Sequence, residues 1–286
     1  MRIGVVFPQN DLRGDAGAVR AYGEGVEELG YTHLLAYDHV VGADPAVHTG
    51  WQGPVDIRST FHEPLVMFGY LAAVTTTLEL VTGVIVLPQR PAVLVAKQAA
   101  EVDLLSNGRL RFGVGLGWNA VEYEALGANM KTRGKRSEEQ VEVLRRLWTE
   151  DSVTFEGRYH RLNGVGLAPM PVQRPIPVWF AAASDPGYER AGRLGDGWFP
   201  MVEPGPDLDY ARAQVEKAAI AAGRDPAAIG MEAQITWTGD PDAVVAGLHA
   251  WAQAGATHVS VNTMGAGLGS VDEHLAALET VAAGIE

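Results

Sequence analysis

The chain has 286 residues, of which 47% are hydrophobic, so it can bury the core of a large α/β domain. It contains no cysteine, which excludes disulfides, iron–sulfur clusters and a cysteine nucleophile. Its 35 acidic and 22 basic residues give a formal net charge of −13, and an acidic surface repels nucleic acid. No signal-peptide pattern and no apolar run of about 20 residues is present, so we expect a cytoplasmic protein with no membrane partner.

Short β-branched apolar runs alternate along the chain with longer stretches of helical periodicity. The first half predicts strands at 3–7, 32–37, 78–87 and 110–114, and helices at 18–29, 64–76, 92–105 and 135–148. A small hairpin is predicted at 153–155 and 159–162. The second half predicts strands at 178–181, 197–201, 231–237 and 258–262, and helices at 186–194, 207–222, 241–254 and 271–283.

This order of elements predicts a single (β/α)₈ TIM barrel that spans residues 1–286 as one domain. The strands are continuous apolar runs, as strands of a parallel sheet are when both faces are buried. Parallel strands need long crossovers, which the intervening helices supply. A doubly wound open sheet is the alternative, but eight regular units without a break in composition favour closure. We expect insertions after strands two and four, overhanging the carboxyl face of the barrel.

Active sites of such barrels form at the carboxyl ends of the strands. Asp38 and His39 follow the second strand and are the candidate catalytic pair, because histidine titrates near neutral pH and a carboxylate or carbonyl can fix its tautomer. A capped turn is the alternative interpretation of the same two residues.

Three further segments at strand ends are candidates for binding a cofactor. Thr82, Gly83 and Val84 interrupt the third strand, and a glycine there indicates a bulge or a closely approaching ligand, or else simple barrel packing. In the GVGLGW run after the fourth strand, Gly115 and Gly117 would let a flat ring system lie against the backbone, with Trp118 as a wall of the pocket or, alternatively, as an ordinary tryptophan that packs in the loop. Ala182, Ala183 and Ser184 precede a helix whose N-terminus suits an anion. Ser184 or Asp185 is equally an ordinary helix cap.

Other reaction classes fit the sequence poorly. Four histidines lie close in sequence, but no His-x-His pair ends a strand and no acidic residue follows a late strand, so we expect no metal site. The G-x-S-x-G elbow of serine hydrolases is missing. The GVGLGW run departs from the G-x-G-x-x-G pattern of nicotinamide-binding Rossmann folds.

Several motifs together resemble the bacterial luciferase-like monooxygenase family. They are LELVTGVIVLP at 78–88, PAVLVAK at 91–97, DLLSNGRL at 103–110, GVGLGW at 113–118, EGRYH at 156–160 and GDGW at 195–198. The resemblance covers essentially the whole chain. Asp38, His39 and the GVGLGW run resemble the branch of that family that uses the deazaflavin coenzyme F420.

This resemblance implies hydride transfer between coenzyme F420 and a small organic substrate. His39 would lie near the reactive carbon of the ring, a cis peptide bond at Thr82–Val84 would lie behind it, and the loop at 182–184 would hold the phosphate. That loop has alanines where the family usually has glycines. Trp118 replaces the glutamate of sugar-phosphate dehydrogenases in the family, which argues against such substrates. Relatives form dimers, so we expect a homodimer. An FMN-dependent two-component monooxygenase and a non-catalytic deazaflavin-binding protein remain alternatives.

Overall fold

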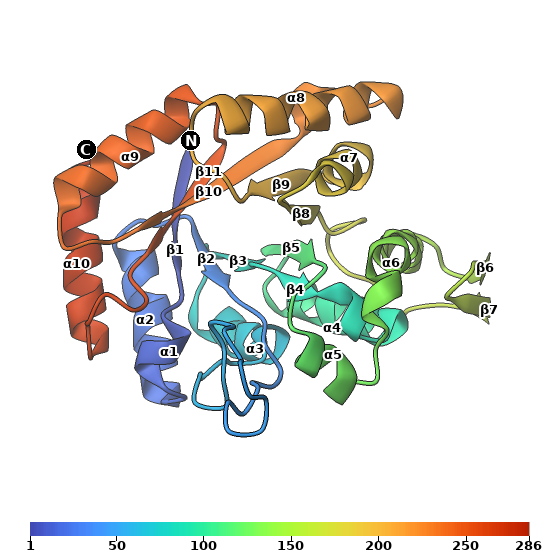
Figure 1. Ribbon diagram of the computed structural model, residues 1–286, viewed down its shortest axis with the longest axis horizontal. Helices are drawn as coiled ribbons and strands as arrows, with labels where there is room; N and C mark the ends of the chain where they lie inside the picture. Colours follow the sequence, from blue (N-terminus) through green and yellow to red (C-terminus); the bar gives the residue numbers. More distant parts are fainter. Residues whose placement is uncertain (286) are drawn as a thin grey trace.

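Parallel strands close into a barrel in the computed structural model, which describes residues 1–285 (Figure 1). The barrel has eight strands, one of which is split into β3 and β4. Because β5 pairs with β3 and β4 on one side and β8 on the other, the sheet has no free edge. The predicted (β/α)₈ fold is therefore confirmed and the open-sheet alternative is wrong. The strands are β1 (Arg2–Val6), β2 (His33–Ala36), β3 (Glu79–Thr82), β4 (Ile85–Val86), β5 (Leu110–Gly115), β8 (Val178–Ala182), β9 (Gly197–Pro200), β10 (Gly230–Thr236) and β11 (His258–Asn262).

Helices surround the strands (Figure 1). The long ones are α2 (Ala16–Glu28), α3 (Pro64–Val74), α4 (Ala92–Leu105), α6 (Arg133–Thr149), α7 (Asp185–Leu194), α8 (Pro206–Ala221), α9 (Pro241–Gln253) and α10 (Val271–Ala283). Each lies within about two residues of its predicted position. The predicted hairpin forms as β6 (Val153–Glu156) and β7 (Arg161–Val165). The short elements α1 (Gln9–Leu12), α5 (Ala120–Ala125), η1 (Leu87–Gln89), η2 (Met130–Thr132) and η3 (Pro226–Ala228) were not predicted.

The third barrel strand breaks where the sequence places a glycine. Between β3 and β4, the peptide bond from Gly83 to Val84 is cis, as the resemblance implied. A Cβ atom at Gly83 would overlap the side chain of Leu35, so β2 and the break lie close together. The buried Thr82 hydroxyl donates a hydrogen bond of 2.7 Å to the Gly113 carbonyl of β5.

Charged side chains fill the amino-terminal part of the barrel interior. Glu232 on β10 accepts a hydrogen bond of 2.6 Å from Ser260, and its Oε1 lies 3.0 Å from Nε2 of His33. Arg111 forms ion pairs with both Glu232 and Glu79. Although burial opposes ionisation, Arg111 and His33 hold the pKa of Glu232 well below its usual range. His33 is therefore a partnered core residue, and this polar cluster closes the barrel below the carboxyl face.

Glu27, near the end of α2, holds the turn that leads into β3. Its carboxylate accepts backbone hydrogen bonds from Thr76, Thr77 and Leu78, at 2.9, 2.5 and 2.8 Å. Partial burial acts to raise the pKa of Glu27, but the hydrogen bonds from these residues outweigh it and lower the pKa to about 2. The carboxylate therefore stabilises the fold in its ionised form.

Replacing Glu27 by glutamine is expected to make the stability less dependent on pH in the acid range. Because the folded-state pKa lies below the ordinary 4.5, the contribution of Glu27 is complete above pH 4.5 and is lost as the pH falls towards 2. Urea unfolding at about pH 7 and about pH 3 measures this, since wild type should lose more stability than Glu27→Gln. The exposed neighbour Glu28, changed to glutamine, serves as control. Equal acid sensitivity of wild type and Glu27→Gln would contradict the assignment.

Candidate active site

A cavity of about 780 Å³ opens at the carboxyl ends of the barrel strands. Its volume lies in the range of small-molecule and cofactor sites. The wall is largely apolar and combines residues from strand ends and from the segment between β2 and α3. Among the lining residues are Asn10, Tyr37, Val55, Phe61, Val86, Phe199, Gln234 and Met264. We refer to it as the ring cavity.

The ring cavity brings together most of the predicted site residues. Its lining includes Asp38, His39, Gly83, Val84, Gly115, Gly117, Trp118, Ala182 and Ala183. Two predicted residues lie outside this lining. Thr82 is fully buried in the barrel wall, where its hydroxyl donates a hydrogen bond to the Gly113 carbonyl of β5. Ser184 is exposed at the start of α7, where it is the N-cap residue without a side-chain capping bond.

His39 lies on the wall of the ring cavity between two aromatic rings. Its ring centroid is 5.0 Å from that of Phe61 and 5.7 Å from that of Trp118. Nδ1 lies 3.4 Å from Oε2 of Glu122, which is within ion-pair range but does not meet hydrogen-bond geometry. Since Nδ1 faces Glu122, Nε2 is the nitrogen left for a bound molecule.

Glu122 is a site residue that the sequence did not reveal. It is 1% exposed, and one carboxylate oxygen accepts hydrogen bonds from the amides of Val40 and Val41 at 2.6 and 3.2 Å. The other accepts a hydrogen bond of 3.2 Å from Gln89. Burial acts to raise the pKa of Glu122, but His39 and the Val40 amide outweigh it and hold the pKa below its usual value. An ionised carboxylate therefore stands behind His39.

The carboxylate of Asp38 has a different partner from the expected one. It accepts a hydrogen bond of 2.6 Å from Arg90 and another of 2.9 Å from the Val86 amide. Arg90 also donates to Glu63, the N-cap of α3, at 2.7 Å. Burial raises the pKa of Asp38, and the adjacent guanidinium of Arg90 opposes that shift. Asp38 therefore anchors β4 and α3, and the carboxylate that faces His39 belongs to Glu122.

The segment between β2 and α3 covers the ring cavity on one side. Pro54, Val55 and Phe61 from this segment line it. Trp51, in the same segment, packs against Trp118 with ring centroids 5.8 Å apart. Trp51 therefore acts on the cavity through Trp118, which is 44% exposed.

Tyr37 after β2 and Gln234 on β10 form the floor of the ring cavity, and Asn262 on β11 supports Tyr37. The Tyr37 hydroxyl donates a hydrogen bond of 2.5 Å to Gln234 and accepts one of 3.3 Å from Asn262. Burial raises the pKa of Tyr37, so its hydroxyl stays protonated at neutral pH. Tyr37 and Gln234 lie inside predicted strands, where the sequence pattern alone indicated only core packing.

Cationic side chains are scarce in the wall of the ring cavity. Its described lining includes no lysine or arginine, and the carboxylates of Asp38 and Glu232 in that wall are paired with Arg90 and Arg111. A flat, uncharged ring therefore fits this cavity.

A family model, described as luciferase-like monooxygenase, matches residues 1–278. The chain belongs to this family. Proteins similar to this chain include F420-dependent enzymes and an FMNH(2)-dependent monooxygenase. Within residues 1–285, no helix is both long and apolar enough to cross a bilayer.

Three relatives illustrate the range of the family. An uncharacterized protein of Mycobacterium tuberculosis is 36% identical over 57% of this chain and 56% of its own length. An FMNH(2)-dependent dimethylsulfone monooxygenase of Pseudomonas fluorescens is 32% identical over 60% of this chain and 47% of its own length. The chain thus spans about half the length of these curated relatives. The solved structure of an F420-dependent secondary alcohol dehydrogenase, in complex with an F420-acetone adduct, matches this chain with a TM-score of 0.78 at 19% sequence identity. The match covers 100% of this chain and 99% of the dehydrogenase chain, and it shows the shared fold.

Replacing Arg90 by methionine is expected to lower the free energy of unfolding by about 3 kcal/mol at neutral pH, because it leaves the buried Asp38 carboxylate without its cation. Arg58→Met removes a comparable ion pair, with Asp56, from the surface and should leave the stability unchanged. Chemical denaturation compares the two. A loss in Arg90→Met no larger than in Arg58→Met would show that Asp38 does not depend on Arg90.

Proposed function

We propose that this protein is an F420-dependent oxidoreductase that transfers a hydride between the deazaflavin coenzyme and a small organic substrate. The observation that carries the proposal is His39, which lies on the wall of an apolar ring-sized cavity with the Glu122 carboxylate behind it. Hydride transfer to a carbonyl or an activated alkene requires a proton as well, and His39 is a proton donor at the place where a ring would bind.

The ring would lie against Val84 and the backbone at Gly83, with Gly115, Gly117 and Trp118 along its edge. Ala182, Ala183 and Ser184 are the proposed contacts to the phosphate. When bound, the reduced deazaflavin supplies a hydride and the oxidised form accepts one. The floor hydroxyl of Tyr37 is a neutral hydrogen-bond donor and supports the polar edge of the ring or of the substrate.

His39 would move the proton that accompanies the hydride. In the reducing direction Nε2 donates a proton to the substrate oxygen or carbon, and in the oxidising direction it accepts one. Glu122 acts through His39, because its charge offsets that of the imidazolium and its position restrains Nδ1. Phe61 and Trp118 exclude water around the imidazole.

An FMN-dependent two-component monooxygenase is the second candidate. It is favoured by the 32% identity to an FMNH(2)-dependent monooxygenase, and an apolar cavity of this size accepts either ring. The two candidates differ in their need for oxygen.

We further propose that the protein is a cytoplasmic homodimer. Helix α3 is apolar on nearly all sides, and Val66 and Tyr70 on it are 70% and 42% exposed. Val93 and Leu94, at the start of the adjacent α4, are 48% and 54% exposed. An exposed apolar surface of this kind suits a subunit interface.

Anaerobic turnover tests the function. Reduced F420 and a panel of ketones, aldehydes and activated alkenes should give F420 oxidation without oxygen, and His39→Ala should lower kcat by roughly 100-fold or more while the coenzyme still binds. The exposed His249 on α9, changed to alanine, is the matched control. Turnover that requires oxygen and FMNH₂ would favour the second candidate, and tight F420 binding with no turnover on any acceptor would favour a binding protein. Full turnover of His39→Ala would remove the catalytic role of the histidine.

A further inference from the structure

A row of hydrogen bonds crosses the floor of the ring cavity, and a backbone amide fixes its direction. The Met264 N–H donates a hydrogen bond of 3.0 Å to Oδ1 of Asn262, so Nδ2 of Asn262 is the atom that donates to the Tyr37 hydroxyl, at 3.3 Å. Because that hydroxyl accepts from Asn262, its single hydrogen goes to Oε1 of Gln234, 2.5 Å away. Gln234 therefore meets Tyr37 with its oxygen and turns its amide nitrogen, Nε2, away from it.

Gln234 offers a hydrogen-bond donor to the ring cavity. None of the hydrogen bonds within residues 1–285 uses its Nε2, and this atom is not sealed in the wall, so it faces the open space of the cavity that Gln234 lines. The row also holds the amide in place from behind, because the Tyr37 backbone N–H donates a hydrogen bond of 2.8 Å to the fully buried Gln9. A fixed amide with free hydrogens suits an oxygen atom of a ligand.

Gln234 lies across the barrel from the surface on which the ring is proposed to lie. Three strands separate β10 from the split strand β3–β4 in either direction: β11, β1 and β2 on one side, and β9, β8 and β5 on the other. Val84, at the break in the split strand, lines the same cavity as Gln234. A ring against Val84 therefore leaves the space between its open face and Gln234 for a substrate.

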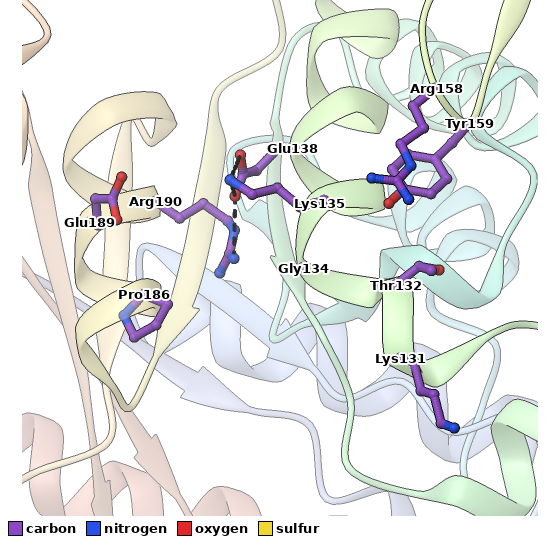
Figure 2. A pocket seen from close by; sticks show the side chains of 10 residues that line it. All are labelled: Lys131, Thr132, Gly134, Lys135, Glu138, Arg158, Tyr159, Pro186, Glu189 and Arg190. Carbon is purple, nitrogen blue, oxygen red and sulfur yellow. Dashed lines mark hydrogen bonds and ion pairs between the residues drawn. The ribbon is translucent and has the colours of Figure 1, made fainter.

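The surroundings of Gln234 suit an uncharged substrate. The described lining of the ring cavity includes no lysine or arginine, and the exposed Glu203 after β9 adds a carboxylate to it. Cations of the neighbouring elements line a separate cavity of about 420 Å³ between the start of α6, the β6–β7 hairpin and α7 (Figure 2). They are Lys131, Lys135, Arg158 and Arg190, and none of them lines the ring cavity. A carboxylate on the substrate would therefore meet no cation beside Gln234.

We propose that Gln234 determines substrate specificity by donating a hydrogen bond from Nε2 to an acceptor oxygen of an uncharged substrate. This inference rests on the proposed function. The substrate lies between the open face of the ring and β10, and the hydrogen bond orients it towards the ring while His39 moves the proton. Tyr37 is a positioning residue, because its hydroxyl holds Oε1 and so aims Nε2 into the cavity. The support that Tyr37 gives to a ligand passes through Gln234.

Steady-state kinetics with reduced F420 test the role of Gln234, with the ketones, aldehydes and activated alkenes of the panel above and a carboxylated analogue of each. Wild type should prefer the uncharged compounds by about 10-fold or more in kcat/KM. Gln234→Glu keeps an oxygen for the Tyr37 hydroxyl but has no N–H, and Gln234→Leu has neither. Both should lower kcat/KM for the uncharged compounds about 10-fold and leave the fluorescence-measured affinity for F420 unchanged. Gln253→Glu, at the exposed end of α9, is the control and should match wild type.

Replacing Tyr37 by phenylalanine tests the positioning role. Tyr37→Phe should raise KM for the uncharged compounds about 3-fold with little change in kcat, because the amide of Gln234 is no longer aimed while His39 is untouched. In a Gln234→Leu background the same replacement should have no further effect on KM, since both residues act through one hydrogen bond. Additive effects of the two replacements would contradict the coupling.

The outcomes separate this inference from the proposed function. Wild-type kcat/KM in both Gln234 variants, or equal use of uncharged and carboxylated compounds by wild type, would overturn the role of Gln234 and leave the proposed function standing. A loss of F420 affinity as large as the loss in kcat/KM would place Gln234 on the cofactor and would also overturn the inference. Reduction of none of the compounds by wild type would overturn both.

Discussion

The ion pair between Arg111 and Glu232 in the barrel interior is the interaction on which the rest of the structure depends. Two charges buried this deeply are stable only when they are paired, and Arg111 meets two carboxylates through Nε and Nη1. The partners come from five strands, since β2 supplies His33, β3 Glu79 and β11 Ser260, in addition to the pair from β5 and β10. A shift of one residue in any strand would turn its partner out of the barrel, so the cluster fixes the register.

Register in turn fixes which residues reach the carboxyl face. With the amino-terminal part of the barrel closed by charged and aromatic side chains, space for a ligand remains at the other end. The break between β3 and β4 brings Val84 to the cavity wall, and the Asp38–Arg90 pair holds Val86 and the start of α3 beside it. His39 then has a defined place between Phe61 and Trp118, with Glu122 behind it.

Much of this arrangement was predictable from the sequence. Apolar runs separated by helical segments predicted the barrel and the approximate boundaries of its strands and long helices, because the periodicity of apolar residues indicates which faces are buried. The position of His39 followed from the rule that strand ends form the site. Glu122, the partner of His39, was not predictable. It lies three residues after Asn119, which is the spacing of an ordinary helix-capping motif, and Asn119 does cap α5. The carboxylate of Glu122 instead reaches the amides of Val40 and Val41, a contact made across 81 residues of sequence or more. Likewise, Asp38 follows the second strand as expected, but only the fold shows that its carboxylate forms an ion pair with Arg90.

The ring cavity is largely apolar and lies at the carboxyl ends of the strands, where a flat ring can bind. The most direct test of this account is a fluorescence titration of the purified protein with coenzyme F420 and, in a parallel cell, with FMN. The account predicts micromolar or tighter binding of F420 and much weaker binding of FMN; preferential binding of FMN would contradict it.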